Sequence, residues 1–323
     1  MPTPQQVKEL RERTGSGVMD CKKALIESGD DVEKAIDWLR AKGLASAAKK
    51  AGRSASEGVV YAHVTADGRG GALLELNCET DFVTRTERFQ ELVRDMVSHV
   101  WTAAPSFVTR AEDGDAPADK VLYEQRFAKD SSKTVEEVLR EAVAVIGENI
   151  QARRMARFEL GSAHGIVHSY IHGGGTHGVL LEVKTDSAAA AADDRFKTLV
   201  NELALHIAAM APEYVRREEI STDAFEKERA VQLEKTIAEG KPEAIAAKIV
   251  DGRMNKWYEE VCLLDQGFLG DDKNKNRARV ADVAKQLGAS IEVVRFVRLV
   301  MGEGIEKKVN DFAAEVAAQA GKA

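Results

Sequence analysis

Cysteine and proline are scarce in this sequence, and long apolar runs are absent. The 323 residues include three cysteines and six prolines. The cysteines are odd in number, far apart and in no CxxC pair, so neither a disulfide framework nor a zinc ribbon is predicted, and we expect reduced thiols. No apolar stretch approaches the roughly 20 residues of a membrane helix, and the N-terminus lacks a signal-peptide layout. We therefore expect a cytoplasmic protein without membrane contact.

An excess of basic residues is also missing. The net charge of -7 argues against a dedicated nucleic-acid binder, which needs a basic face. Lys49, Lys50 and Arg53 are interpreted as a solvated surface. No GxxxxGK[ST] segment and no arrangement of nucleophile and base occurs, so we expect no nucleotide binding, no cofactor and no catalysis by this chain. A protein partner fits the composition better.

Three helices are predicted in the first fifty residues, forming an N-terminal bundle of the ubiquitin-associated (UBA-like) type. Pro4 suits a first turn and Gln6 completes a capping box. The predicted N-caps are Thr3, Ser16 and either Asp30 or Asp31, and the predicted terminators are Gly15, Gly29 and Gly43.

The chain after this bundle contains a repeat. Shifting the sequence by 107 positions overlays residues 58–105 on 165–212 without a gap, and fourteen of the 48 pairs are identical. Each copy predicts a strand, a Gly-rich turn, a second strand and an amphipathic helix. The fold class is therefore α+β, with a duplicated hairpin-plus-helix core.

One turn differs between the copies. In "NCETDFVTRTERF", the segment from Thr80 to Val83 lies opposite 187–190, where the second copy has only small residues. Two interpretations of Phe82 stay open: it fills a gap in the first half, or it is a contact for a partner. The fold itself does not need a phenylalanine at this turn, because the second copy lacks one.

The segment "HGGGTHG" has glycines in dinucleotide-fingerprint spacing, but the strand "VLLEVK" follows, so we predict a hairpin turn. His164, His168, His172 and His177 cluster around it, but no ligand set at typical spacing is complete, and we predict no metal site. His99 and His206 occupy equivalent positions on the two helices and are interpreted as structural.

Two helical elements follow the repeat. Residues 222–261 predict an antiparallel helical hairpin broken at "GKP", either a protruding arm or an ordinary packed pair. The segment "SIEVVRFVRL" alternates like a strand, and an amphipathic helix from about Ile305 forms a C-terminal helical module that docks on the core or binds a partner.

Several separated motifs resemble those of the bacterial elongation factor Ts family. They are "VKELRERTGSGVMDCKKAL", "AAKKAGRSASEGVV", "NCETDFV", "VIGENIQARR", "SYIHGGG" and "GKPEAIAAKIVDGRM". The resemblance covers nearly the whole chain and implies a guanine nucleotide exchange factor that binds elongation factor Tu with GDP in translation elongation. It implies release of GDP by disturbance of the Mg²⁺–phosphate site of Tu, and it is compatible with a 2:2 assembly.

The resemblance also implies a division of the chain and a set of contacts with Tu. The expected divisions are 1–53 (UBA-like domain and linker), 54–158 (N-terminal half of the core), 159–221 and 262–303 (C-terminal half), 222–261 (coiled-coil arm) and 304–323 (C-terminal module). The implied contacts are Arg11, Met19, Lys22, Lys50, Thr80, Asp81, Phe82, Val83, Ile146, Gly147 and His172.

Two rival functions explain less of the sequence. A chaperone or ubiquitin-like binding module would account for the N-terminal bundle alone. An enzyme acting at the histidine hairpin would account for the four clustered histidines. Neither gives a purpose to the duplicated core with its single-copy Phe82.

Overall fold

The structure mixes helices and strands, as expected for an α+β protein. A computed structural model describes residues 1–240 and 242–306. The chain divides into two compact units, and each is described by itself. Unit 1 contains Met1–Tyr61, Leu74–Met155 and, of the described residues, 300–306; unit 2 contains Ala62–Leu73 and Ala156–Leu299. Among the described helices, none is long and apolar enough to cross a membrane.

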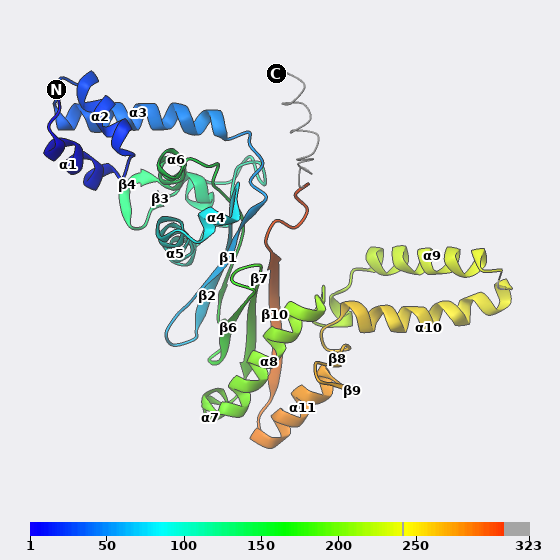
Figure 1. The fold of residues 1–323 in the computed structure, drawn as a ribbon. Coiled ribbons are helices and arrows are strands. Elements are labelled where there is room, and N and C mark those ends of the chain that lie inside the picture. Colours follow the sequence, from blue (N-terminus) through cyan, green and yellow to red (C-terminus); the bar gives the residue numbers. More distant parts are fainter. Residues whose placement is uncertain (241, 307–323) are drawn as a thin grey trace. The chain divides into compact units, whose positions relative to one another are not determined.

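Three helices, α1 (Pro4–Thr14), α2 (Val18–Glu27) and α3 (Val32–Lys50), begin unit 1 (Figure 1). The predicted boundaries of α1 are confirmed, because Thr3 and Gln6 form a reciprocal capping box and Gly15 caps the other end in the left-handed conformation. Asp31 caps α3 by accepting from the amide of Lys34. The side chains buried between these helices are Leu10, Cys21, Ala24, Leu25 and Ala35.

Two of the predicted helix boundaries are wrong. Ser16 does not cap α2, because the turn is one residue longer and Gly17 stands at the N-cap without a side-chain bond. Gly43 does not end α3, which continues to Lys50. A Cβ on Gly43 would lie 2.8 Å from the Cβ of Ala144 in α6 (Val135–Ile146). This glycine therefore allows two helices to approach closely and does not break one.

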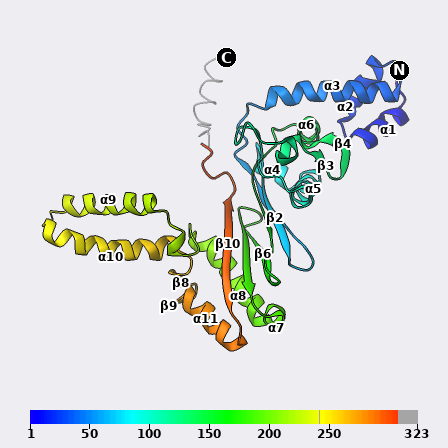
Figure 2. The same ribbon diagram turned by 180° about the vertical axis from the view of Figure 1, so that it is seen from behind.

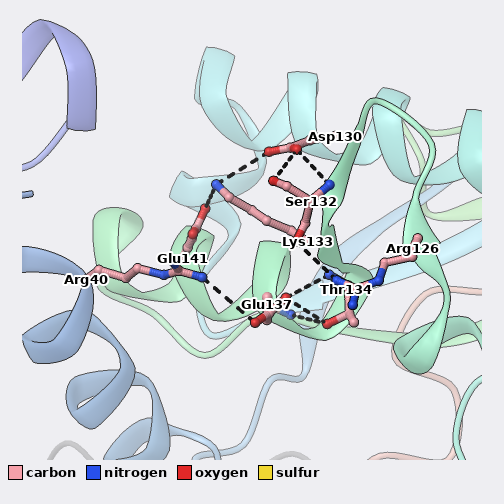
Figure 3. Close-up of polar contacts among 8 residues, drawn as sticks. All are labelled: Arg40, Arg126, Asp130, Ser132, Lys133, Thr134, Glu137 and Glu141. Carbon is pink, nitrogen blue, oxygen red and sulfur yellow. Dashed lines mark hydrogen bonds and ion pairs between the residues drawn. The ribbon is translucent and has the colours of Figure 1, made fainter. Parts of the chain in front are cut away.

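Polar contacts also tie α3 to α6 (Figure 3). Arg40 of α3 lies 3.8 Å from the carboxylate of Glu137. Glu137 completes a capping box with Thr134 at the start of α6. The ammonium of Lys133 lies 2.6 Å from the carboxylate of Glu141 one turn further along. These contacts hold α6 in place, and the segment around Gly147 begins where this helix ends.

The first half of the core pairs its strands in the order β1–β2–β5 and adds a small β3–β4 sheet. Its elements are β1 (Glu57–Val64), β2 (Gly70–Cys78), α4 (Asp81–Thr84), α5 (Glu87–Ala103), η1 (Ala118–Lys120), η2 (Leu122–Glu124), β3 (Arg126–Phe127), β4 (Asp130–Thr134), α6 and β5 (Gln151–Glu159). Every residue of β2 is buried, so this strand lies at the centre of the core.

The second half repeats this plan with the order β6–β7–β10 and a small β8–β9 sheet. Its elements are β6 (His164–His172), β7 (His177–Thr185), α7 (Ala188–Ala192), α8 (Asp194–Met210), η3 (Arg217–Glu219), α9 (Thr222–Ala238), α10 (Glu243–Val261), β8 (Gly267–Phe268), β9 (Asp271–Lys275), α11 (Asn276–Leu287) and β10 (Ile291–Val300). The predicted repeat and the predicted strand at 290–299 are confirmed.

The duplication extends further than the sequence comparison indicated. The order β3, β4, α6, β5 recurs as β8, β9, α11, β10. Equivalent buried carboxylates are paired in both halves, with Glu75 2.6 Å from Arg154 and Glu182 2.7 Å from Arg295. The two halves therefore share both their topology and their buried ion pair.

The buried histidines are part of the same repeated framework. His99 lies 2.9 Å from the side-chain oxygen of Gln125, and His206 lies 2.9 Å from that of Gln266. Burial lowers the pKa of both imidazoles. In the first half the amide of Ala128 donates to Nδ1 of His99, so Nε2 carries the proton that is donated to Gln125. The structural interpretation of these histidines fits these contacts.

Helices α9 and α10 interrupt the second half only. They lie side by side in both views (Figures 1 and 2). At their base the guanidinium of Arg217 lies 4.3 Å from the centre of the Tyr258 ring. Lys241, in the predicted break between these helices, lies outside the described residues. The predicted C-terminal helix that starts near Ile305 also lies outside them, apart from Ile305 and Glu306.

Candidate functional site

The turn after β2 presents an exposed aromatic side chain. Thr80 is the N-cap of α4, and Phe82 in its first turn is 78% exposed. Phe82 therefore does not fill a gap in the core of this chain, and that interpretation of the residue is wrong. Asp81 is exposed beside it and lies 3.4 Å from Arg85.

A carboxylate from a distant part of the sequence holds this turn. Oε2 of Glu148 accepts from the amides of Glu79 and Thr80 at 3.1 and 3.0 Å, and Oε1 accepts from the hydroxyl of Thr80 at 2.6 Å. In return, the amide of Asn149 donates to Glu79 at 2.7 Å. The turn and the "VIGEN" segment are thus joined by four hydrogen bonds.

The same segment contacts the linker that follows α3. α6 ends at Ile146, and Gly147 caps it with a φ of 92°, which favours glycine. A Cβ on Gly147 would lie 4.0 Å from the ammonium of Lys50. The side-chain amide of Asn149 donates to the carbonyl of Arg53 at 2.8 Å. Three separate stretches of sequence therefore meet here: the linker, the Phe82 turn and the end of α6.

A buried thiol lies beneath the turn. Cys78 at the end of β2 donates to the carbonyl of Thr80 at 3.1 Å. Burial raises the pKa of this thiol to about 12. Burial also raises the pKa of Cys262, to about 11, and all three cysteines are free and buried. The expectation of reduced thiols agrees with these positions, and burial favours the protonated thiol at all three.

The three predicted contacts on the N-terminal bundle lie on α1 and α2. Met19 is 75% exposed and stands beside the exposed Val18. Arg11 and Lys22 are also exposed. Arg88 of α5 lies against Gly15, where a Cβ would be 1.8 Å from its guanidinium. This end of α1 thus approaches the helix that follows the Phe82 turn.

His172 belongs to unit 2, where it ends β6. The predicted hairpin is confirmed, because β6 pairs with β7 and His172 stands opposite His177. The hydroxyl of Tyr170 lies 3.0 Å from Nδ1 of His172. Within residues 1–240 and 242–306, no three His, Cys, Asp or Glu side chains are grouped so that they could hold a metal ion.

Glu148 and Asn149 are site residues that sequence reasoning missed. In the second half Ala289 and Ser290 stand at their positions, where Ser290 donates its amide to Asp186 at 3.0 Å. The signal was present in the sequence, because Glu148 is a single-copy residue in the same way as Phe82. To detect this signal, the repeat must be extended beyond residues 58–105 and 165–212. The added segments are only weakly similar, and the α9–α10 insertion interrupts the second copy.

An exposed aromatic side chain beside a carboxylate, on a turn held by hydrogen bonds, is the kind of group that protein–protein interfaces use as an anchor. The fold defines a duplicated α+β protein in which one half has an exposed phenylalanine on its turn. The family model described as elongation factor TS matches residues 79–303. The chain belongs to the elongation factor Ts family.

Known relatives match the chain over nearly their full length. Elongation factor Ts of Trichlorobacter lovleyi is 46% identical over 319 residues, covering 99% of this chain and 98% of the relative. That of Clostridium botulinum is 44% identical over 322 residues and covers 100% of both chains. That of Aquifex aeolicus is 44% identical over 298 residues, covering 92% of this chain and 97% of the relative. These relatives place the chain among factors of translation elongation.

Proposed function

We propose that this protein is the guanine nucleotide exchange factor of elongation factor Tu and that it releases GDP from Tu. The observation that carries the proposal is the exposed Phe82 on a turn held by Glu148, in a chain of the elongation factor Ts family. The protein itself binds neither nucleotide nor nucleic acid, and it acts in the cytoplasm as a binding protein without catalytic side chains.

The action follows from reciprocal linkage. A factor that binds nucleotide-free Tu more tightly than Tu with GDP weakens GDP binding by the same coupling free energy. GTPases hold GDP through backbone amides around the phosphates and through a Mg²⁺ ion that keeps several waters. Small displacements of these groups therefore loosen both the metal and the nucleotide. The factor accelerates exchange without changing the equilibrium between GDP and GTP.

In this proposal the Phe82 turn delivers the displacement. Phe82 enters between helices of Tu near the Mg²⁺ site, and Asp81 competes for polar groups there. Thr80 and Val83 flank this contact, while Lys50, Ile146 and Gly147 extend it along unit 1. The remaining proposed contacts are Arg11, Met19 and Lys22 on the N-terminal bundle and His172 in unit 2.

The division of the chain is also part of the proposal. The three N-terminal helices with their linker form a UBA-like domain over 1–53, and the two core halves cover 54–158 and 159–221 with 262–303. Helices α9 and α10 form a protruding arm over 222–261, and 304–323 is the C-terminal module. The proposal is compatible with a 2:2 assembly of the exchange factor and Tu.

Release of fluorescent GDP from purified Tu tests the exchange function. We expect the release rate to rise with the concentration of this protein and to level off at saturation. The intact protein without Tu serves as the control and should bind no fluorescent GDP. An unchanged release rate at saturating protein would contradict the proposed function.

A further inference from the structure

The turn that carries Phe82 has local hydrogen bonds on its C-terminal side, where the hydroxyls of Thr84 and Thr86 donate to the carbonyls of Asp81 and Val83, but it has no local side-chain cap at its start. Thr80 is the N-cap of α4, a position where threonine ordinarily accepts from the next turn, but its side chain makes no such bond. Its hydroxyl donates instead to Glu148, 68 residues away in sequence. The only ion pair of Asp81 in the described part of the chain is with Arg85, and it is exposed and weak.

The second half closes the equivalent turn differently. Ser187 caps α7 locally by accepting from the amide of Ala190 at 3.3 Å. The position of Glu148 is taken by Ala289, which cannot accept with its side chain. The same fold therefore forms this turn without a distant carboxylate. A structural need common to both halves does not explain Glu148.

The difference coincides with the exposure of the aromatic side chain. Ala190 packs into the second half and is 3% exposed, whereas Val83 at its position is not buried and Phe82 projects into solvent. A projecting side chain gains no order from packing in the free protein. A turn held by charge-assisted hydrogen bonds loses less conformational freedom when it binds, which favours the bound state.

We propose that Glu148 is a positioning residue for nucleotide exchange, whose carboxylate fixes the turn so that Phe82 is presented in its binding orientation. This role rests on the proposed function. Glu148 acts through the amides of Glu79 and Thr80 and through the Thr80 hydroxyl, and it needs no contact with Tu.

Hydrogen exchange on the free protein tests the structural part. We expect Glu148→Ala to remove the protection of the Glu79 and Thr80 amides while the protection of β2 stays. Glu148→Gln keeps one acceptor oxygen, so this variant should lose only part of the protection of these two amides. The matched control is Asp186→Ala in the second half, which should leave residues 79–86 unchanged. Unchanged protection of both amides in Glu148→Ala would overturn the proposal.

A double-mutant cycle tests the functional part. With Phe82 present, Glu148→Ala should lower the rate of GDP release from Tu about tenfold, and in a Phe82→Ala background by less than about twofold, because the two residues act as one unit. An equal loss in both backgrounds would overturn the positioning role, since Glu148 would then act independently of Phe82. If the unmutated protein fails to release GDP, the proposed function fails, while the hydrogen-exchange result still decides whether Glu148 holds the turn.

Discussion

The two halves of the core share a framework but differ in what they present to solvent. Both contain a buried glutamate paired with an arginine, a buried His–Gln pair and a three-stranded sheet. Only the first half has an exposed phenylalanine on its turn, and only the second contains the α9–α10 insertion. The repeated residues maintain the fold, so the single-copy residues are the ones available for a partner.

The largest expected effect is on the free energy of unfolding, through the repeated Glu–Arg pairs. The pair of the first half is more deeply buried than that of the second. Glu75 is fully buried and faces both Arg153 and Arg154, so Glu75→Ala should lower the free energy of unfolding by about 3 kcal/mol. Arg295, the partner of Glu182, is half exposed, and Glu182→Ala should cost only about 1–2 kcal/mol. Urea unfolding of both variants measures the difference. Equal costs would show that the halves do not differ in this respect.

The next effect concerns the single-copy aromatic. Phe82→Ala should leave the free energy of unfolding within about 1 kcal/mol of the unmutated protein, because the side chain is exposed. It should weaken the coupling that expels GDP by about 2 kcal/mol, as expected for an aromatic anchor. Calorimetric melting and GDP release measure the two quantities on one preparation.

The second half supplies the control for that variant. Ala189 occupies the matching turn, and adding Ala189→Phe to Phe82→Ala should restore no exchange. A Phe82→Ala protein that unfolds several kcal/mol more easily and exchanges normally would assign the residue to the core after all.

Removal of the α9–α10 insertion should have a smaller effect. The amides of Glu213 and Tyr214 donate to the carbonyl of Val261, so residues 260–262 must be kept. Replacing 222–259 by a short Gly-Ser linker loses the contact of Arg217 with Tyr258, worth about 0.5–1 kcal/mol. The first half closes the equivalent position with a short connection, so we expect cooperative melting and residual exchange. Loss of the cooperative transition would place these helices in the core.

The smallest effect is a pH dependence shared by both halves. Burial lowers the pKa of His99 and His206 in the folded state, while the unfolded chain takes up these protons near pH 6.5. The stabilisation is complete above that pH and is lost as the pH falls toward the lowered values. Unfolding between pH 7.5 and 5.5 should show this slope, and His99→Gln and His206→Gln should each reduce it. Burial also lowers the pKa of His168, so both variants should keep a residual slope. A slope as steep as that of the unmutated protein in both variants would contradict the assignment of the pH dependence to His99 and His206.

Local signals in the sequence predicted much of this fold. The capping box at Thr3, the caps at Gly15 and Asp31 and the first part of the repeat depend on neighbouring residues, and each is found. Gly43 was misread because its helix continues against Ala144, a contact between distant segments. Long-range packing thus overrides a local stop signal.

The candidate site was predictable only in part. Phe82 could be identified from the sequence because the second copy of a closely similar repeat has Ala189 at its position. Glu148 was missed because its role is a set of hydrogen bonds to backbone groups far away in sequence, which composition and periodicity do not reveal. The short strands β3, β4, β8 and β9 carry too few residues for a pattern, so the second part of the duplication became visible only in the structure.

Amide hydrogen exchange of the two matching turns, measured in the free protein and in its complex with nucleotide-free Tu, tests the central claim most directly. The account predicts that residues 79–86 gain protection on binding and that residues 186–193 do not. Protection of the second turn alone, or of neither turn, would contradict the assignment of the Phe82 turn as the contact that releases GDP.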